Sequence, residues 1–162
     1  YMKGLMDKPE EFTTLASFYL YKKNPAMSAK VLEKAITNED IDFDNTNAKL
    51  LADSWLFAKE RLKSLNVIGR SLNNDPEDAK LIKQYINIAF SAFEWDEVIR
   101  GIKKADEAGL KDDGKFALMK GIAYFEKKSI TNAKNSFIEA SNSKEYKDQG
   151  IAWLEYLEAL NG

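Results

Sequence analysis

The sequence contains neither cysteine nor histidine among its 162 residues. Without cysteine, the chain has no disulfide and no thiolate nucleophile or metal ligand. Without histidine, Ser-His-Asp catalysis, Cys-His catalysis and an ordinary zinc site are excluded as well. We therefore expect a protein that is not an enzyme, that needs no metal or other cofactor, and that holds other molecules rather than transforming them.

Surplus positive charge and long apolar runs are also absent. Lysine and arginine total 24, aspartate and glutamate total 26, and the formal net charge is −2. A nucleic-acid partner is not expected, because phosphate binding needs a basic surface. No run approaches the roughly 18 apolar residues that span a bilayer, so direct membrane insertion is not expected either. The mixture of 44% apolar and 31% charged residues is typical of a folded domain.

Proline and glycine are scarce, with three and eight copies, which is too few for an all-β chain with many turns. Apolar residues instead recur at helical spacing, as at Ile82, Tyr85, Ile86 and Ala89. Polar breaks separate such segments at intervals of roughly 15 to 20 residues. The pattern predicts an all-α chain of roughly nine helices joined by short loops.

Several polar breaks carry the chemistry of helix ends. Asn24-Pro25 and Asp75-Pro76 each predict a side-chain N-cap followed by proline at the first helical position. Gly109 is expected to form a left-handed C-terminal cap. These signals predict helices beginning at residues 25 and 76 and a helix ending near residue 108.

An internal repeat is the strongest signal in the sequence. Gly121, Tyr124, Ala133, Phe137 and Ala140 follow a small–aromatic–small–large–small order that suits two antiparallel helices. Similar frames begin at residues 9, 45 and 79. The pattern resembles the tetratricopeptide repeat (TPR) family, whose unit is about 34 residues. The resemblance implies a right-handed α-solenoid of helix-turn-helix units 9–44, 45–78, 79–113 and 114–147, with a capping helix at 148–162.

The repeats imply one TPR domain over residues 1–162, and the ends of the chain suggest a fragment of a longer repeat protein. We expect residues 1–7 to end a helix of a preceding unit. In the third unit, Ile86 is large and Ala89 small where the family has the reverse, which indicates a compensated exchange of volume or a locally altered packing angle. In the last helix, Ile151, Leu154 and Leu157 are expected to share one face.

The TPR resemblance also implies where a partner would bind. In that family the first helix of each unit lines a concave surface that receives a peptide or a partner helix. The alternative role for such apolar positions is ordinary packing between units. The positions that the resemblance carries over are Tyr21, Lys49, Asp53, Phe57, Lys83, Asn87, Phe90, Met119, Ile122, Phe125, Trp153 and Tyr156.

Three short motifs resemble known ligand-binding sites, but each lacks residues that such a site requires. Residues 109–115 have the glycine and lysine spacing of a phosphate loop, but Phe116 replaces the magnesium-binding hydroxyl. Residues 40–45 begin like a calcium loop, but the sixth and twelfth places hold Asn45 and Leu51 instead of glycine and glutamate. Lys83 and Asn87 have the spacing of a carboxylate clamp but lack matching pairs in the other units. We therefore expect residues 109–115 to form an inter-repeat turn, residues 40–45 to form an acidic connector, and Lys83 and Asn87 to be solvated side chains.

Segments 51–60, 94–98 and 151–158 resemble repeat proteins encoded beside TonB–ExbB–ExbD energy-transduction systems in Gram-negative bacteria. This narrower resemblance implies a periplasmic accessory of TonB-dependent transport, with a cytoplasmic location as the alternative. Two functions stay open. One is a scaffold that binds a protein or peptide partner, and the other is a self-assembly module that forms a homodimer through its terminal helix, at Trp153 and Leu157.

Overall fold

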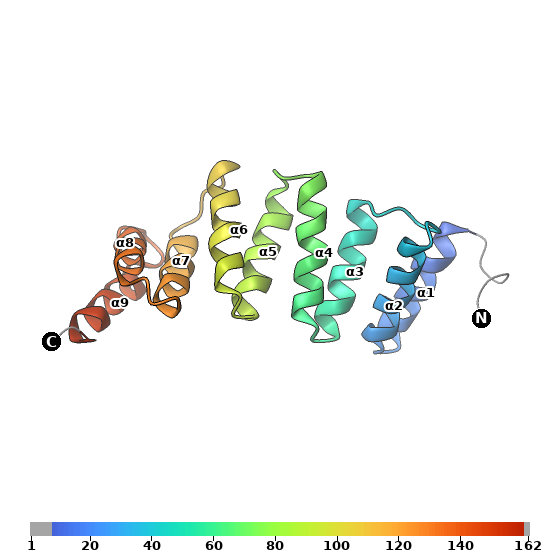
Figure 1. Ribbon diagram of the computed structural model, residues 1–162, viewed down its shortest axis with the longest axis horizontal. Helices are drawn as coiled ribbons and strands as arrows, with labels where there is room; N and C mark the ends of the chain where they lie inside the picture. Colours follow the sequence, from blue (N-terminus) through green and yellow to red (C-terminus); the bar gives the residue numbers. More distant parts are fainter. Residues whose placement is uncertain (1–7, 161–162) are drawn as a thin grey trace. The chain divides into compact units, whose positions relative to one another are not determined.

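The computed structural model describes residues 8–160, and within that range it is built from α-helices (Figure 1). The all-α fold with roughly nine helices is confirmed, because nine helices and no strand occur there. The expected helix in residues 1–7 lies outside the described residues. The helices are α1 (Pro9–Tyr21), α2 (Pro25–Thr37), α3 (Asn45–Phe57), α4 (Arg61–Asn74), α5 (Ala79–Ser91), α6 (Trp95–Glu107), α7 (Lys115–Glu126), α8 (Ile130–Ser141) and α9 (Lys147–Leu160).

The first eight helices form four hairpins, and the turns of these hairpins have the same conformation. Residues 22–24, 58–60, 92–94 and 127–129 join the two helices of each hairpin. The middle residue of every turn has a positive φ: 57° at Lys23, 64° at Lys59, 60° at Phe93 and 60° at Lys128. Residues other than glycine rarely adopt this conformation. Its recurrence shows that the four hairpins are copies of one local structure.

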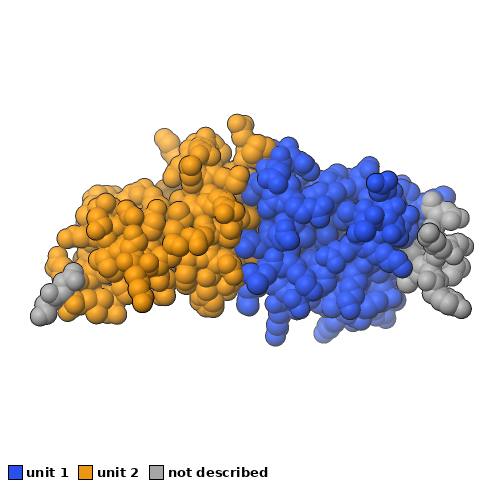
Figure 2. Space-filling model, in the orientation of Figure 1, with its two compact units in different colours: residues 1–75 blue, residues 76–162 orange. Residues whose placement is uncertain are grey.

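The chain divides into two compact units, residues 1–75 and 76–162 (Figure 2). Unit 1 contains α1–α4, and small side chains lie among the larger apolar ones in its interior. Ser28 of α2 and Ser54 of α3 are fully buried and share a hydrogen bond of 2.9 Å between their hydroxyls. The buried Ser64 hydroxyl donates to the backbone oxygen of Ala52 at 2.8 Å. Small residues therefore let these helices approach closely, and their polar atoms are satisfied.

Unit 2 contains α5–α9, and its first hairpin accommodates the unusual Ile86. Both Ile86 and Ala89 are fully buried. The residue of α6 that faces Ile86 is Gly101, where a Cβ would lie only 2.7 Å from the Ile86 Cγ1. The glycine removes the volume that the isoleucine adds, which favours a compensated exchange for this hairpin.

The helix-end predictions are confirmed at two places and wrong at one. The Asn24 side chain accepts from the Met27 amide at 3.3 Å, and Gly109 has a φ of 66°. The start predicted at Pro76 is wrong, because α5 begins at Ala79. Its N-cap is Asp78, whose carboxylate accepts from the amides of residues 80 and 81 at 2.8 and 3.0 Å. A carboxylate that satisfies two helix-end donors fixes the start more strongly than the proline does.

The expected face of α9 is also partly wrong. Gly150 and Leu157, seven residues apart, are the buried positions, whereas Ile151 is exposed. A Cβ at Gly150 would lie 2.5 Å from the backbone nitrogen of Ser141. The helix turns this glycine toward α8 because a larger residue could not approach so closely, and Leu157 follows it inward.

Candidate functional site

Four of the predicted partner-binding residues lie together in unit 2, on α7 and α9. We call this group, Ile122, Phe125, Trp153 and Tyr156, the aromatic surface. Its ring centroids are 5.3 Å apart for Phe125 and Trp153, 5.9 Å for Phe125 and Tyr156, and 5.7 Å for Trp153 and Tyr156. Each helix contributes two side chains spaced by three residues, which places both on one face of that helix.

A buried layer holds the aromatic surface in place from below. The ring of Phe137, on α8, is fully buried and stacks on Trp153 at a centroid distance of 4.9 Å and an interplanar angle of 8°. Ala133 and Leu157 complete this core, and Ile122, Phe125 and Trp153 pack against it. The rings of the surface are therefore fixed before any partner binds, which lowers the entropic cost of binding.

The aromatic surface is only partly covered. Tyr156 is 48% exposed, and Ile122, Phe125 and Trp153 are half-buried. Covering apolar area is favourable by roughly 25 cal/mol per Å², and aromatic side chains present much of it. Met119, also predicted on α7, is buried and presents little area to a partner.

A polar group lies on the neighbouring first helices of unit 2. The Lys115 ammonium of α7 donates to the Asn87 side-chain oxygen of α5 at 3.1 Å. Lys83 is exposed on α5, one turn before Asn87. This bond ties together α5 and α7, the two helices that start successive hairpins.

Phe90 belongs to a different aromatic group, at the turn between α5 and α6. It meets Trp95 edge-to-face at 5.6 Å, and Phe93 meets the same indole at 5.7 Å. Phe93 is 71% exposed and was not among the predicted residues. Its place in a polar break next to Glu94 gave no apolar periodicity that could have pointed to it.

The predicted residues of unit 1 do not form one group. Tyr21 and Phe57 are the last residues of α1 and α3, and both side chains are strongly exposed. Lys49 is exposed and Asp53 half-buried on α3. The exposed aromatic residues therefore lie at hairpin turns, whereas the charged pair lies along the helix.

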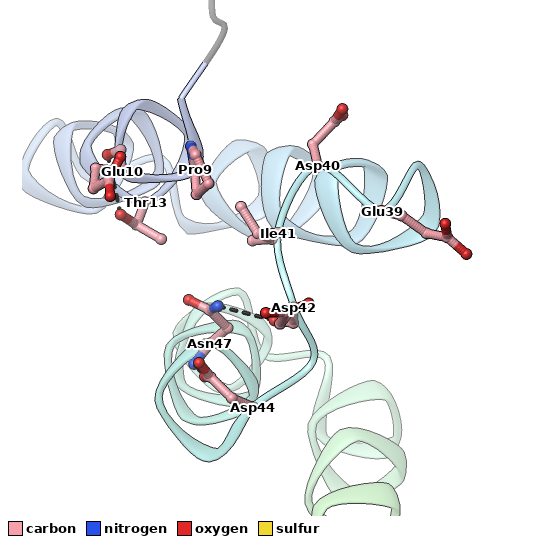
Figure 3. A pocket seen from close by; sticks show the side chains of 9 residues that line it. All are labelled: Pro9, Glu10, Thr13, Glu39, Asp40, Ile41, Asp42, Asp44 and Asn47. Carbon is pink, nitrogen blue, oxygen red and sulfur yellow. Dashed lines mark hydrogen bonds between the residues drawn. The ribbon is translucent and has the colours of Figure 1, made fainter.

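Unit 1 also has an acidic hollow of about 400 Å³, formed by the start of α1, the connection from α2 to α3, and the start of α3 (Figure 3). Asp44 accepts from the Asn47 amide at 2.8 Å, and the Asn47 side-chain amide donates to the Asp42 backbone oxygen at 2.9 Å. Across residues 8–160, no group of three or more potential ligand residues is placed to hold a metal ion. This segment acts as a connector that caps α3. Its lining residues are Pro9, Glu10, Thr13, Glu39, Asp40, Ile41, Asp42, Asp44 and Asn47.

The loop with phosphate-loop spacing also serves as a helix cap. The Asp112 carboxylate accepts from the Gly114 amide at 3.0 Å and from the Phe116 amide at 2.5 Å. Two amides at the start of α7 are thus already occupied by an anion of the protein itself. The inter-repeat turn expected from the sequence is what the structure contains.

Comparison with known proteins shows the fold class. No family model matches the sequence, and no curated relative matches it. Two crystal structures of MamA are similar to this chain, both at 17% identity and over 91% of its length. They give TM-scores of 0.62 and 0.63, and the matches cover 85% and 79% of the MamA chains. With its successive helical hairpins, the chain shares the all-helical fold of these structures, and the all-α fold class predicted from the sequence is confirmed.

Proposed function

We propose that this chain is a non-catalytic scaffold whose unit 2 binds an apolar segment of a partner protein on the aromatic surface. One observation carries the proposal. Three aromatic rings lie within 6 Å of one another, are supported by the buried Phe137, and remain partly exposed at Tyr156. Partly exposed, preorganised aromatic residues are the usual anchors of protein–protein binding.

The titratable groups favour binding over catalysis. Burial, followed by the hydrogen bond that its hydroxyl donates to Glu97, raises the pKa of Tyr85 well above its ordinary range. Tyr85 is buried in the hairpin of α5 and α6 and holds its proton. Its shifted pKa thus reflects packing rather than an acid or base positioned for a substrate.

The experiment places a photo-crosslinking amino acid at position 156 in cells and compares it with the same label at position 93. Both replaced residues are exposed aromatic residues of unit 2. We expect a discrete adduct at position 156 that the substitution Phe125→Asp removes. Tyr156→Asp should lower capture of the same partner by tenfold or more, since anchor residues contribute about 2 kcal/mol or more. Phe93→Asp is the matched control.

Equal loss in Tyr156→Asp and Phe93→Asp would contradict binding at the aromatic surface. The identity of the captured partner then tests the narrower resemblance. Recovery of inner-membrane energy-transduction components would support a periplasmic accessory of TonB-dependent transport. Recovery of cytosolic proteins alone would contradict it and favour the cytoplasmic alternative.

Self-assembly through α9 is the second candidate function. Ile151 and Leu160 are exposed large apolar residues of this helix. Light scattering over a range of concentrations tests the idea, and Leu160→Glu should shift any dimer toward monomer. Leu157→Glu is unsuitable, because Leu157 is buried in the core and a charge there would unfold the helix. A strict monomer at high concentration would rule out this function.

A further inference from the structure

The strongly exposed large apolar side chains of unit 1 gather at its two hairpin turns. Over residues 8–75 these side chains are Tyr21, Phe57, Leu62 and Phe18, with exposed fractions of 79%, 68%, 59% and 51%. Phe18 and Tyr21 end α1, Phe57 ends α3, and Leu62 begins α4. Apolar side chains scattered singly need no explanation, but a concentration at two neighbouring turns does.

The two turns lie at the same end of unit 1. Ser28, in the first turn of α2, is hydrogen-bonded to Ser54, in the last turn of α3. This buried contact fixes the turn of residues 22–24 beside the turn of residues 58–60. In Figure 1 both turns lie at the end of unit 1 opposite the connection from α2 to α3. Residues 18–23 and 57–63 thus form one edge, which we call the basic aromatic edge.

The charge of this edge differs from that of the whole chain. Its charged residues are five basic side chains and one glutamate, a net charge of +4 in a chain whose net charge is −2: Lys22, Lys23, Lys59, Glu60, Arg61 and Lys63. The opposite end of unit 1 holds the acidic hollow. Unit 1 is therefore polarised, with positive charge and exposed aromatic residues at one end and negative charge at the other.

The basic side chains are available to an external anion. Lys22 lies 5.5 Å from the Phe18 ring centroid and 5.6 Å from that of Tyr21, contacts that leave its ammonium exposed. Lys63 and Glu60 are 3.9 Å apart with half of each side chain exposed, so their pairing is weak. The edge keeps most of its positive charge facing solvent.

We propose that unit 1 docks peripherally on an anionic lipid bilayer through the basic aromatic edge. Aromatic side chains favour the headgroup region of a bilayer, and lysine or arginine beside them adds attraction to anionic lipids. Among the helices between residues 8 and 160, none has both the length and the apolar character that crossing a bilayer requires. The contact is therefore with the surface. The exposed apolar residues stand at helix ends beside the two turns, and none of them lines the acidic hollow, which suits a soft, continuous phase better than a folded partner.

Vesicle flotation tests the proposal with the intact chain. The probes are vesicles of phosphatidylcholine mixed with phosphatidylserine and vesicles of phosphatidylcholine alone. We expect binding to the anionic vesicles that falls with added salt, and little binding to the neutral ones. The paired substitutions Tyr21→Ser and Phe57→Ser should abolish most of it. Phe93→Ser is the matched control, because Phe93 is equally exposed but lies in unit 2 beside Glu94.

A second matched pair tests the charge. Lys59→Glu lowers the net charge of the edge by two. At about fivefold per charge near the membrane, it should lower the partition coefficient onto anionic vesicles about 25-fold. Lys34→Glu makes the same change in unit 1, but Lys34 lies about 15 Å along α2 from the turn at 1.5 Å per residue. Screening over about 10 Å should limit its effect to about twofold.

Three results would overturn the proposal. The first is equal binding to neutral and anionic vesicles, and the second is an equal loss of vesicle binding in Lys59→Glu and Lys34→Glu. The third is binding to polyglutamate without binding to anionic vesicles, a result that would assign the edge to an acidic protein. Tyr156→Asp should leave vesicle binding unchanged, so the outcome is independent of the function proposed for the aromatic surface. Far-UV circular dichroism of each variant confirms that its helices are retained.

Discussion

Replacing Gly121 by alanine tests how closely α7 and α8 pack beneath the aromatic surface. A Cβ at position 121 would lie 2.4 Å from Cε1 and 2.5 Å from Cδ1 of Phe137, far inside ordinary contact. The Phe137 ring cannot simply swing away, because it is fully buried and its face stacks on Trp153. The added methyl group must therefore separate the two helices or disturb the stacked pair.

Two opposing effects set the magnitude of the Gly121→Ala change. Alanine is favoured over glycine inside a helix by about 1 kcal/mol. Overpacking a well-filled core costs about 1–3 kcal/mol. Since Trp153 supports the ring that must move, we expect the upper part of that range. The net result is a loss of about 1–2 kcal/mol in the free energy of unfolding of unit 2.

Hydrogen exchange of peptides from α7 and α8, together with urea denaturation, measures the loss within this unit. The double-mutant cycle with Phe137→Leu supplies the control. Leucine lacks the ring atoms nearest to position 121, so Gly121→Ala should cost less in that background. If Gly121→Ala stabilised the protein, or cost the same in both backgrounds, the inferred close contact would be wrong.

Three further predictions concern turns, caps and a buried phenol. Lys59→Gly should stabilise unit 1 by about 0.5–1 kcal/mol in urea denaturation, because glycine adopts the positive φ of this turn without strain. The control Lys49→Gly, inside α3, should destabilise unit 1 by about 1 kcal/mol. Asn24→Ala removes the bond to the Met27 amide and should cost about 1 kcal/mol, seen as faster amide exchange at the start of α2. The raised pKa of Tyr85 means that its contribution to the stability of the folded state is complete below about pH 10 and is lost as the pH rises further. Absorbance titration should therefore show a late phenol ionisation that disappears in Tyr85→Phe.

The sequence predicted the helices well because helical spacing of buried residues is a local property. It placed the turn at Asn24-Pro25 correctly, since the cap and the proline act on the same helix start. It misplaced the start of α5, because Asp75 and Asp78 are both possible caps and only the packed structure selects between them. The left-handed turn residues could not be predicted, because lysine and phenylalanine carry no preference for that conformation.

The candidate site was less predictable from sequence than the fold. Met119 and Ile122 lie one turn apart on α7, and both were assigned to the partner-binding surface, yet Met119 is buried and Ile122 half-buried. A first helix packs against two neighbours, so apolar residues cover most of its circumference and periodicity does not show which remain open. The basic aromatic edge was missed for another reason. Its residues come from two turns that are far apart in sequence and are brought together through Ser28 and Ser54.

Trp153 connects the stability of unit 2 to its aromatic surface. One ring contact is with the buried Phe137, and the others are with Phe125 and Tyr156. A partner that binds there only when unit 2 is folded stabilises it by mass action. By the same linkage, Gly121→Ala should weaken partner binding although residue 121 is buried, because the added methyl group displaces the Phe137 ring that stacks on Trp153. Tyr156 is half-exposed, and its ring meets Phe125 and Trp153 rather than the buried Phe137, so its substitution should lower partner binding more than it lowers stability. This contrast distinguishes apolar residues that bind a partner from apolar residues that pack between helices, and helical spacing alone cannot make that distinction.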